Sequence, residues 1–427
     1  MKKIIFLCCG FLLFSLGNAG AEVIKKGETL TLTRCISIAL KYSPIIAEAE
    51  NTVKVNESQI GQAKAGYYPQ VSATTNYSRQ LPASPSNVTV SSGVFNQYSA
   101  GLGLQQNIYD FGKTSSKINI AKSNTRASYA TLYNTEQQVI FNVTQAYFNV
   151  GQTQKVVDVD KQAIAEYQQQ LNQAKAGYNV GVKPLIDVTN AQVSLGNAKL
   201  NLINGENNLK DAEISLNIAM GIPNPPSYTL KNTLSFKPYN ITLNKALTSA
   251  YQNRQDLKSL HFQEQAAVYN EHLAKTGYYP TISGNADYDW GGQDFPLSHG
   301  WSVLLTFSLP IFNGYLTKYQ IKQAEANLEV LRSDENQLRQ SIYSVVQQDY
   351  LNLQSAIQQI QVAKTTVKQA KQNLDIARGS YKVGVATYLD VTTAIVSYLT
   401  AQQNYIQALY NYRIAQAGLE QAMGVIK

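Results

Sequence analysis

Few residues in this sequence could carry out chemistry, and their spacing fits no catalytic motif. FGKTS (111–115) resembles the end of a phosphate-binding loop, but the first glycine of that motif would fall at Asn107. The three histidines, His261, His272 and His299, are not spaced as metal ligands. No nucleophile motif is present. The sequence therefore predicts a protein that is not an enzyme and that binds no metal or other cofactor.

The chain is instead organised as two similar halves. AKAGYYPQVS (63–72) recurs as AKTGYYPTIS (274–283), and AGYNVGVKPLIDVTNAQVSL (176–195) recurs as GSYKVGVATYLDVTTAIVSYL (379–399). Self-similarity at a period of about 200 residues is too long for a solenoid and indicates a tandem duplication. The expected divisions are a first repeat over 22–221, a linker over 222–241, a second repeat over 242–424 and a C-terminal end over 425–427.

The N-terminus predicts export. Lys2 and Lys3 precede a short apolar run and a small-residue cleavage site, so we expect a signal peptide over 1–21. Cys35 is then the one mature cysteine, which excludes an intramolecular disulfide. The formal charge of +8 is spread along the chain without a basic block, so we do not expect nucleic acid as a partner.

Each half predicts the same three helices around a pair of strands. The expected helices are 33–66, 113–177 and 184–220 in the first half, and 245–277, 315–380 and 387–423 in the second. A helix of about 65 residues would be roughly 100 Å long, far more than a bilayer needs. Apolar residues recur in 346–381 with an average step of about 3.5, which predicts a left-handed coiled-coil pair with the next helix.

Two alternating segments follow the first helix of each half. The expected strands 70–77 and 98–104 lie in a hairpin over 67–109, and the expected strands 281–290 and 301–309 lie in a hairpin over 278–312. One face of each strand is apolar and the other is polar, a pattern typical of outer-membrane barrel strands. A soluble hairpin with one wet face is the alternative. The predicted signal peptide and the flanking aromatic residues favour the membrane.

Aromatic residues mark the ends of these segments, as expected at a membrane interface where the ring is buried and the hydroxyl stays wet. Pro69 and Pro280 stop the preceding helix and suit the first residue of a strand. The predicted membrane-interface residues are Tyr67, Tyr68, Tyr109, Tyr278, Tyr279, Trp301 and Phe312. Segments 79–96 and about 290–300 are expected to face the cell exterior.

Four strands cannot close a barrel, and open edges are not tolerated in hydrocarbon. The chain is therefore expected to oligomerise. Two chains would give an eight-stranded barrel filled by side chains, and three would give twelve strands with an open lumen.

The repeated GYYP strand entries, the segment PIFNG (310–314) and the pattern Tyr-x-Val-Gly-Val-x-x-x-x-Asp-Val at the turn resemble the TolC-type outer-membrane efflux factors. The resemblance covers essentially the whole mature chain. It implies an α+β membrane protein in which a trimeric twelve-stranded outer-membrane β-barrel, four strands per chain, continues into a long periplasmic α-helical coiled-coil barrel. The implied location is the outer membrane of a Gram-negative cell, in contact with its lipid.

The implied function is the exit duct of a tripartite efflux or type I secretion system. Its implied partners, besides the other chains of the homotrimer, are a periplasmic adaptor protein and an inner-membrane pump of the RND, ABC or MFS type. A barrel-anchored trimeric coiled-coil adhesive or structural protein is the alternative. The short external segments disfavour it, because they leave no large passenger.

By motif position, the resemblance also implies a periplasmic gate built from the two turns. Its residues would be Tyr178, Gly181, Lys183, Asp187, Tyr381, Gly384 and Asp390. The family pattern has an arginine where Ala386 stands and a second acid where Thr393 stands, so the closed state must be latched differently. Lys183 occupies the first-half position equivalent to Ala386 and could pair with either aspartate. Asp390 could form an acidic ring around the symmetry axis, cap its helix in a box with Thr387, or do both.

Overall fold

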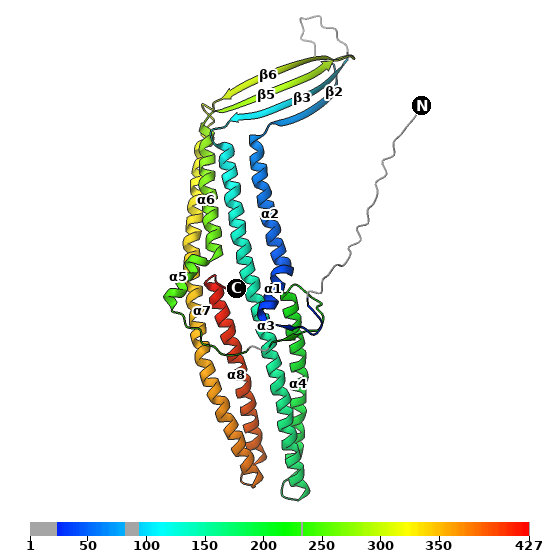
Figure 1. Ribbon diagram of the computed structural model, residues 1–427, viewed down its shortest axis with the longest axis vertical. Coiled ribbons are helices and arrows are strands. Elements are labelled where there is room, and N and C mark those ends of the chain that lie inside the picture. The colour runs from blue at the N-terminus through cyan, green and yellow to red at the C-terminus, as the bar shows by residue number, and fades with distance from the viewer. Residues whose placement is uncertain (1–23, 82–93, 232–233, 427) are drawn as a thin grey trace, which may run out of the picture.

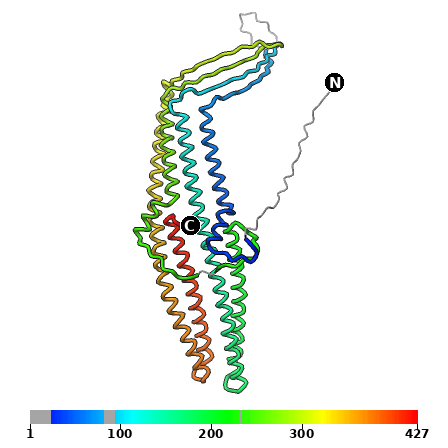
Figure 2. The backbone as a smooth tube through the Cα atoms, in the orientation of Figure 1, coloured from blue at the N-terminus to red at the C-terminus, as the bar shows by residue number. Residues whose placement is uncertain are grey.

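The computed structural model describes residues 24–81, 94–231 and 234–426 (Figure 1). Two helices of 67 residues, α3 (Lys113–Asn179) and α7 (Leu316–Lys382), run the length of the helical part. The shorter helices α2 (Pro44–Lys64) and α4 (Leu185–Ala219) lie one after the other along α3 (Figure 2). α6 (Gln255–Lys275) and α8 (Tyr388–Ala422) follow α7 in the same way. Each half thus pairs one long helix with shorter helices stacked end to end.

The seam between α7 and α8 is the predicted coiled coil. We call the antiparallel pairs α3–α4 and α7–α8 the two helical hairpins. The residues of α7 that are buried at the expected spacing are Val346, Leu353, Ile360, Leu374 and Tyr381. The residues of α8 that are buried in the same clusters are Val391, Ile395, Tyr398, Leu409, Tyr412 and Leu419. Contacts between α3 and α8 join the two halves below the middle of the molecule. The hydrophobic effect therefore holds each hairpin together and holds the two hairpins side by side.

The first helix of each half was predicted as continuous, and this was wrong. α1 (Leu32–Tyr42) is separated from α2 at Ser43, and α5 (Leu243–Asn253) is separated from α6 at Arg254. Ser43 has φ −66° and ψ 123° because Pro44 disfavours a helical residue before it. Arg254 has nearly the same dihedrals, φ −61° and ψ 126°, without a proline.

Four antiparallel strands form one sheet in the order β2 (Gln70–Gln80), β3 (Phe95–Tyr109), β5 (Thr281–Gly292) and β6 (Ser298–Ser308). The sheet sits at one end of the helices (Figure 1). The connection between β5 and β6 is shorter than the predicted external segment of about 290–300, because β5 extends to Gly292 and β6 begins at Ser298. A separate parallel pair, β1 (Thr29–Leu30) and β4 (Thr229–Leu230), lies near the middle of the molecule.

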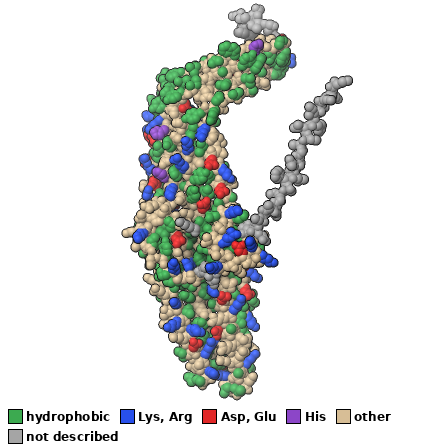
Figure 3. All heavy atoms as spheres, in the orientation of Figure 1, with side chains coloured by type: hydrophobic (Ala, Val, Ile, Leu, Met, Phe, Trp, Pro, Cys, Tyr) green, Lys and Arg blue, Asp and Glu red, His purple; other side chains and the backbone are tan. Residues whose placement is uncertain are grey.

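The strand register gives the sheet two different faces. Ser72, Gly103, Asp287 and Ser302 are register partners in one row of the polar face. The next row along the strands, on the other face, joins Ala73, Leu102, Tyr288 and Trp301. Hydrophobic side chains gather over the sheet, and most charged side chains lie on the helices (Figure 3). The apolar face is thus suited to lipid and the polar face to a water-filled lumen.

The predicted signal peptide over 1–21 lies outside the described residues, as does most of the predicted external segment 79–96. Among the helices in the described ranges, none combines the length and hydropathy needed to cross a membrane.

Candidate functional site

The end of the molecule farthest from the sheet consists of two turns, which join α3 to α4 and α7 to α8 (Figure 1). Gly181 and Gly384 have φ of 75° and 83°, a left-handed conformation that glycine adopts without the steric penalty of a Cβ. The Gly384 amide donates to the Tyr381 carbonyl, which closes the second turn at 3.2 Å. The two turns bring Lys183 and Asp187 of the first half close to Tyr381 of the second.

Tyr381 contacts the other hairpin through two polar groups, Asp187 and Lys183. Its hydroxyl donates to Asp187 Oδ2 over 3.4 Å, a long hydrogen bond. Lys183 makes no ion pair with Asp187 or Asp390 in the described structure; its Nζ lies 4.1 Å from the centre of the Tyr381 ring instead. A cation placed over an aromatic face is attracted by the ring quadrupole.

Burial, followed by the charge of the Asp187 carboxylate, raises the pKa of Tyr381 to about 12. The phenol therefore remains protonated at neutral pH and serves as the donor in its contact with Asp187.

A second cross-hairpin contact was not predicted from the sequence. Arg378 of α7 forms an ion pair with Glu166 of α3, and both side chains are largely buried, with 21% and 15% exposed. Tyr388 of α8 and Ser194 of α4 share a hydrogen bond of 3.2 Å. These contacts flank an apolar cluster of Leu171, Ala174, Val188, Ala191, Leu195, Leu374, Tyr381, Tyr388, Val391, Ala394, Ile395 and Tyr398. We call the contacts Arg378–Glu166, Tyr381–Asp187, Lys183–Tyr381 and Tyr388–Ser194 the latch.

Asp390 caps its own helix. Asp390 Oδ2 accepts hydrogen bonds of 2.7 Å from the Thr387 amide and from its hydroxyl, and Thr387 Oγ1 accepts from the Asp390 amide, which completes a capping box. The bond from the Thr387 backbone is the main reason that the pKa of Asp390 lies below its ordinary value. The carboxylate is fully exposed and charged at neutral pH.

Most of the predicted interface aromatics form a belt where the sheet meets the helices. Tyr67, Tyr68, Tyr278 and Tyr279 lie at the two helix-to-strand junctions and are exposed. The other members of this proximal belt are Tyr109, Phe111, Phe312 and Tyr315, linked by ring contacts of Tyr109 with Phe111, Phe111 with Tyr279, and Phe312 with Tyr315. Phe111 and Tyr315 were not among the predicted residues.

Trp301 lies at the opposite end of the sheet. It pairs with Tyr288, whose ring centroid is 4.6 Å from that of Trp290. Tyr77 and Tyr98 also lie at this end, with ring centroids 5.2 Å apart. Trp301 lies seven positions before Ser308 in β6, about 23 Å along the strand. Two aromatic belts at this separation match the two interfaces of an outer-membrane barrel.

The described residues contain no group of three or more His, Cys, Asp or Glu side chains placed to hold a metal ion.

A family model described as "Outer membrane efflux protein" matches residues 35–222 and 246–425, which include both repeats. The chain is 26% identical over 385 residues to outer membrane protein TolC of Escherichia coli (strain K12), covering 86% of this chain and 77% of that protein. It is 23% identical over 401 residues to outer membrane efflux protein BepC of Brucella suis, covering 92% of this chain and 86% of that protein.

Solved structures show the same fold. The Campylobacter jejuni CmeC outer membrane channel superposes with a TM-score of 0.80 at 20% sequence identity, covering 92% of this chain and 85% of that one. In this fold three chains each contribute four strands to a twelve-stranded barrel that continues into a helical barrel. The chain therefore belongs to the outer membrane efflux protein family, and it is an outer-membrane channel extending into the periplasm rather than an enzyme.

Proposed function

We propose that the chain forms a gated exit duct, closed at its periplasmic end by the latch. The observation that carries this proposal is that the cross-hairpin contacts nearest the tips include a largely buried ion pair, Arg378–Glu166, whereas those nearer the middle of the described structure are hydrogen bonds between neutral groups. Breaking the latch would let the α7–α8 hairpin move away from the α3–α4 hairpin. The Arg378–Glu166 ion pair would do the work of the arginine that the family pattern has at the position of Ala386.

We further propose that the two turns dock a periplasmic adaptor, through which an inner-membrane pump of the RND, ABC or MFS type delivers cargo. Val180, Val182, Val383 and Val385 are between 71% and 83% exposed at the turns. Apolar side chains this exposed at the tip of a polar helical hairpin are suited to contact with another protein. Service in type I secretion is part of the same proposal, because it needs the same docking.

Deletion of the gene is expected to increase susceptibility to some members of a panel of toxic compounds. Wild type restores resistance, and Val180→Asp/Val383→Asp does not, because a charged tip loses its apolar contact with the adaptor. Val180→Ile/Val383→Ile is the control and should restore resistance, provided that trimer levels in the membrane match. Full resistance with the aspartate variant would rule out docking through these tips.

The Asp390 ring is a separate prediction. Three exposed carboxylates around the axis would attract multivalent cations in addition to capping their helices. Asp390→Asn is expected to weaken the block of single-channel current by hexaamminecobalt added on the periplasmic side, with trimer stability nearly unchanged, because asparagine can still accept the hydrogen bonds from Thr387. A variant that keeps the wild-type block but melts at a lower temperature would leave Asp390 as a helix cap alone.

A further inference from the structure

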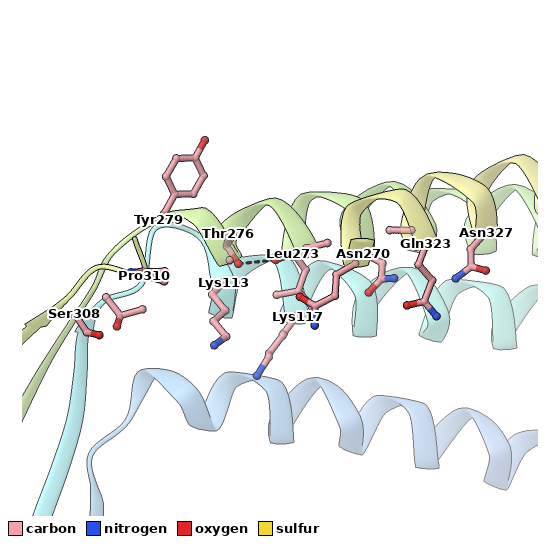
Figure 4. Close-up of a pocket in the computed structure, with 15 residues that line it drawn as sticks. Lys113, Lys117, Asn270, Leu273, Thr276, Tyr279, Ser308, Pro310, Gln323 and Asn327 are labelled. Atoms are coloured by element: carbon pink, nitrogen blue, oxygen red, sulfur yellow. Dashed lines mark hydrogen bonds between the residues drawn. The ribbon is translucent and has the colours of Figure 1, made fainter. Parts of the chain in front are cut away.

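A groove of about 610 Å³ lies where the helices meet the sheet, across α3, α6 and α7 (Figure 4). Its polar lining from the helices is Lys113, Lys117, Asn270, Gln320, Gln323 and Asn327. Nothing in the latch, the tips or the aromatic belts accounts for this concentration of amide and ammonium groups.

The strand residues in the lining show whether the groove opens toward the lumen of the channel or toward its outer surface. Thr281 and Ser308 are register partners at the ends of β5 and β6. Thr281 lies two residues before Ser283, and Ser308 lies two residues after Thr306; Ser283 and Thr306 are register partners on the polar face. Side chains two positions apart on a strand share a face, so Thr281 and Ser308 are also on the polar face. The polar face lines the lumen, because the apolar face must meet lipid. The groove is therefore part of the luminal wall just below the membrane.

Lys113 and Lys117 are the only charged residues in the described lining, and neither forms an ion pair in the described structure. They are one turn apart on α3, so their charges repel each other. Both also lie near the N-terminus of α3, where the helix dipole disfavours a cation. The nearest acid in sequence, Asp110, is already engaged: its carboxylate accepts hydrogen bonds from the Gly112 and Thr114 amides.

The charges on a separate groove of α6 and α7 are arranged differently. Its lining includes Glu271, Lys322, Glu325, Glu329 and Arg332, so both signs are present. Three of these residues are in ion pairs: Glu271 pairs with Lys275 outside the lining, and Glu329 pairs with Arg332. The luminal groove is thus lined by charges of one sign, whereas the second groove is lined by charges of both signs.

The amides of Asn270, Gln323 and Asn327 add hydrogen-bond donors that no described residue uses. In Figure 4 these side chains and the two lysines project from neighbouring helices on the same side of the ribbon. Ammonium and amide donors on a concave wall match the geometry of an oxyanion, whose several oxygens each accept hydrogen bonds.

We propose that this luminal groove binds the oxyanion group, phosphate, sulfonate or carboxylate, of anionic cargo on its way through the duct. The trimer would carry three grooves and six lysines at one level of the lumen. The inference rests on the channel assembly but not on the latch or on a particular pump.

Inorganic triphosphate is the probe for a binding test on purified trimers in non-ionic detergent at low salt. Calorimetry is expected to show one site per chain. Lys113→Gln/Lys117→Gln should weaken binding by about tenfold or more, because two close charges are removed. Lys122→Gln is the matched control: Lys122 is an exposed lysine of α3 outside the groove, and its loss should leave binding within about twofold.

The proposal is overturned if wild type binds no triphosphate or if Lys122→Gln weakens binding as much as the double variant. Phospholipid phosphorus on the purified trimers distinguishes a lipid source. A loss of bound phospholipid in the double variant, without triphosphate binding to wild type, would assign the groove to lipid headgroups and refute a cargo site. Bilayer recordings separate these failures from failure of the duct itself, because a trimer that conducts but binds no triphosphate refutes only the groove.

Discussion

Resting conductance of the purified channel is expected to rise about tenfold when Arg378→Gln is combined with Tyr381→Phe. Arg378→Gln leaves the largely buried Glu166 carboxylate without its partner, which destabilises the closed arrangement of the hairpins. Tyr381→Phe removes the hydroxyl that contacts Asp187 but keeps the ring under Lys183. A loss of about 1.4 kcal/mol of closed-state stability is enough for a tenfold change in the open population.

Lys382→Gln is the control for this experiment. It removes the same charge one turn from Arg378, at an exposed position of α7 that has no ion pair in the described structure. Its resting conductance should equal that of wild type. The single variants should each give a smaller rise than the double variant. A double variant with wild-type conductance and an unchanged melting temperature would show that these contacts do not hold the duct closed.

The arrangement of helices and strands was predictable because the sequence repeats it. Alternation in 70–77 and 301–309 identified strands that the structure places in β2 and β6, and the 3.5-residue period identified the seam of α7 and α8. Both patterns arise because each element buries one face, and the spacing of apolar residues that this requires can be read from a single sequence. The two-faced sheet followed from the same information.

The break at Arg254 was not predictable, because no nearby residue encodes it. Pro44 signals the break at Ser43, but the segment around Arg254 contains no proline or glycine. The break coincides with a packing contact from the other end of the repeat: a Cβ on Gly424 would lie 2.9 Å from the Arg254 amide nitrogen. Tertiary contact decides the helix ends here, which a local pattern cannot show.

The candidate site was predicted only in part for a similar reason. The turn motifs identified Tyr381, Asp187 and Lys183, which the structure brings together. Glu166 and Arg378 are 212 residues apart and belong to no motif, so their pairing depends on how α3 and α7 are rotated about their axes. Trp301 was grouped with the junction tyrosines because composition shows that an aromatic is at an interface but not at which one.

Substitution of Gly221 is expected to have the largest effect on stability. Gly221 ends the first repeat at φ 74°, and an added Cβ would lie 2.4 Å from the Tyr42 carbonyl oxygen and 3.0 Å from the Ser43 amide nitrogen. These are backbone atoms that cannot move easily, because the Ser43 amide already donates to the Ala39 carbonyl at 2.9 Å and Pro44 follows. Gly221→Ala should therefore destabilise the chain by at least about 3 kcal/mol, through strain at positive φ together with the clash.

Two other glycines make this prediction quantitative. Gly181 has nearly the same φ, 75°, but an added Cβ there meets nothing within 4 Å, so Gly181→Ala should cost only about 1 kcal/mol. Gly424 is the second-repeat equivalent of Gly221, with its closest approach at 2.9 Å, and should fall between the two. Melting temperatures of the purified trimers, and the amount of trimer recovered from outer membranes, should decrease in the order Gly181→Ala, Gly424→Ala, Gly221→Ala. Equal losses at Gly181 and Gly221 would mean that backbone conformation alone sets the cost and that the clash with Tyr42 and Ser43 contributes nothing.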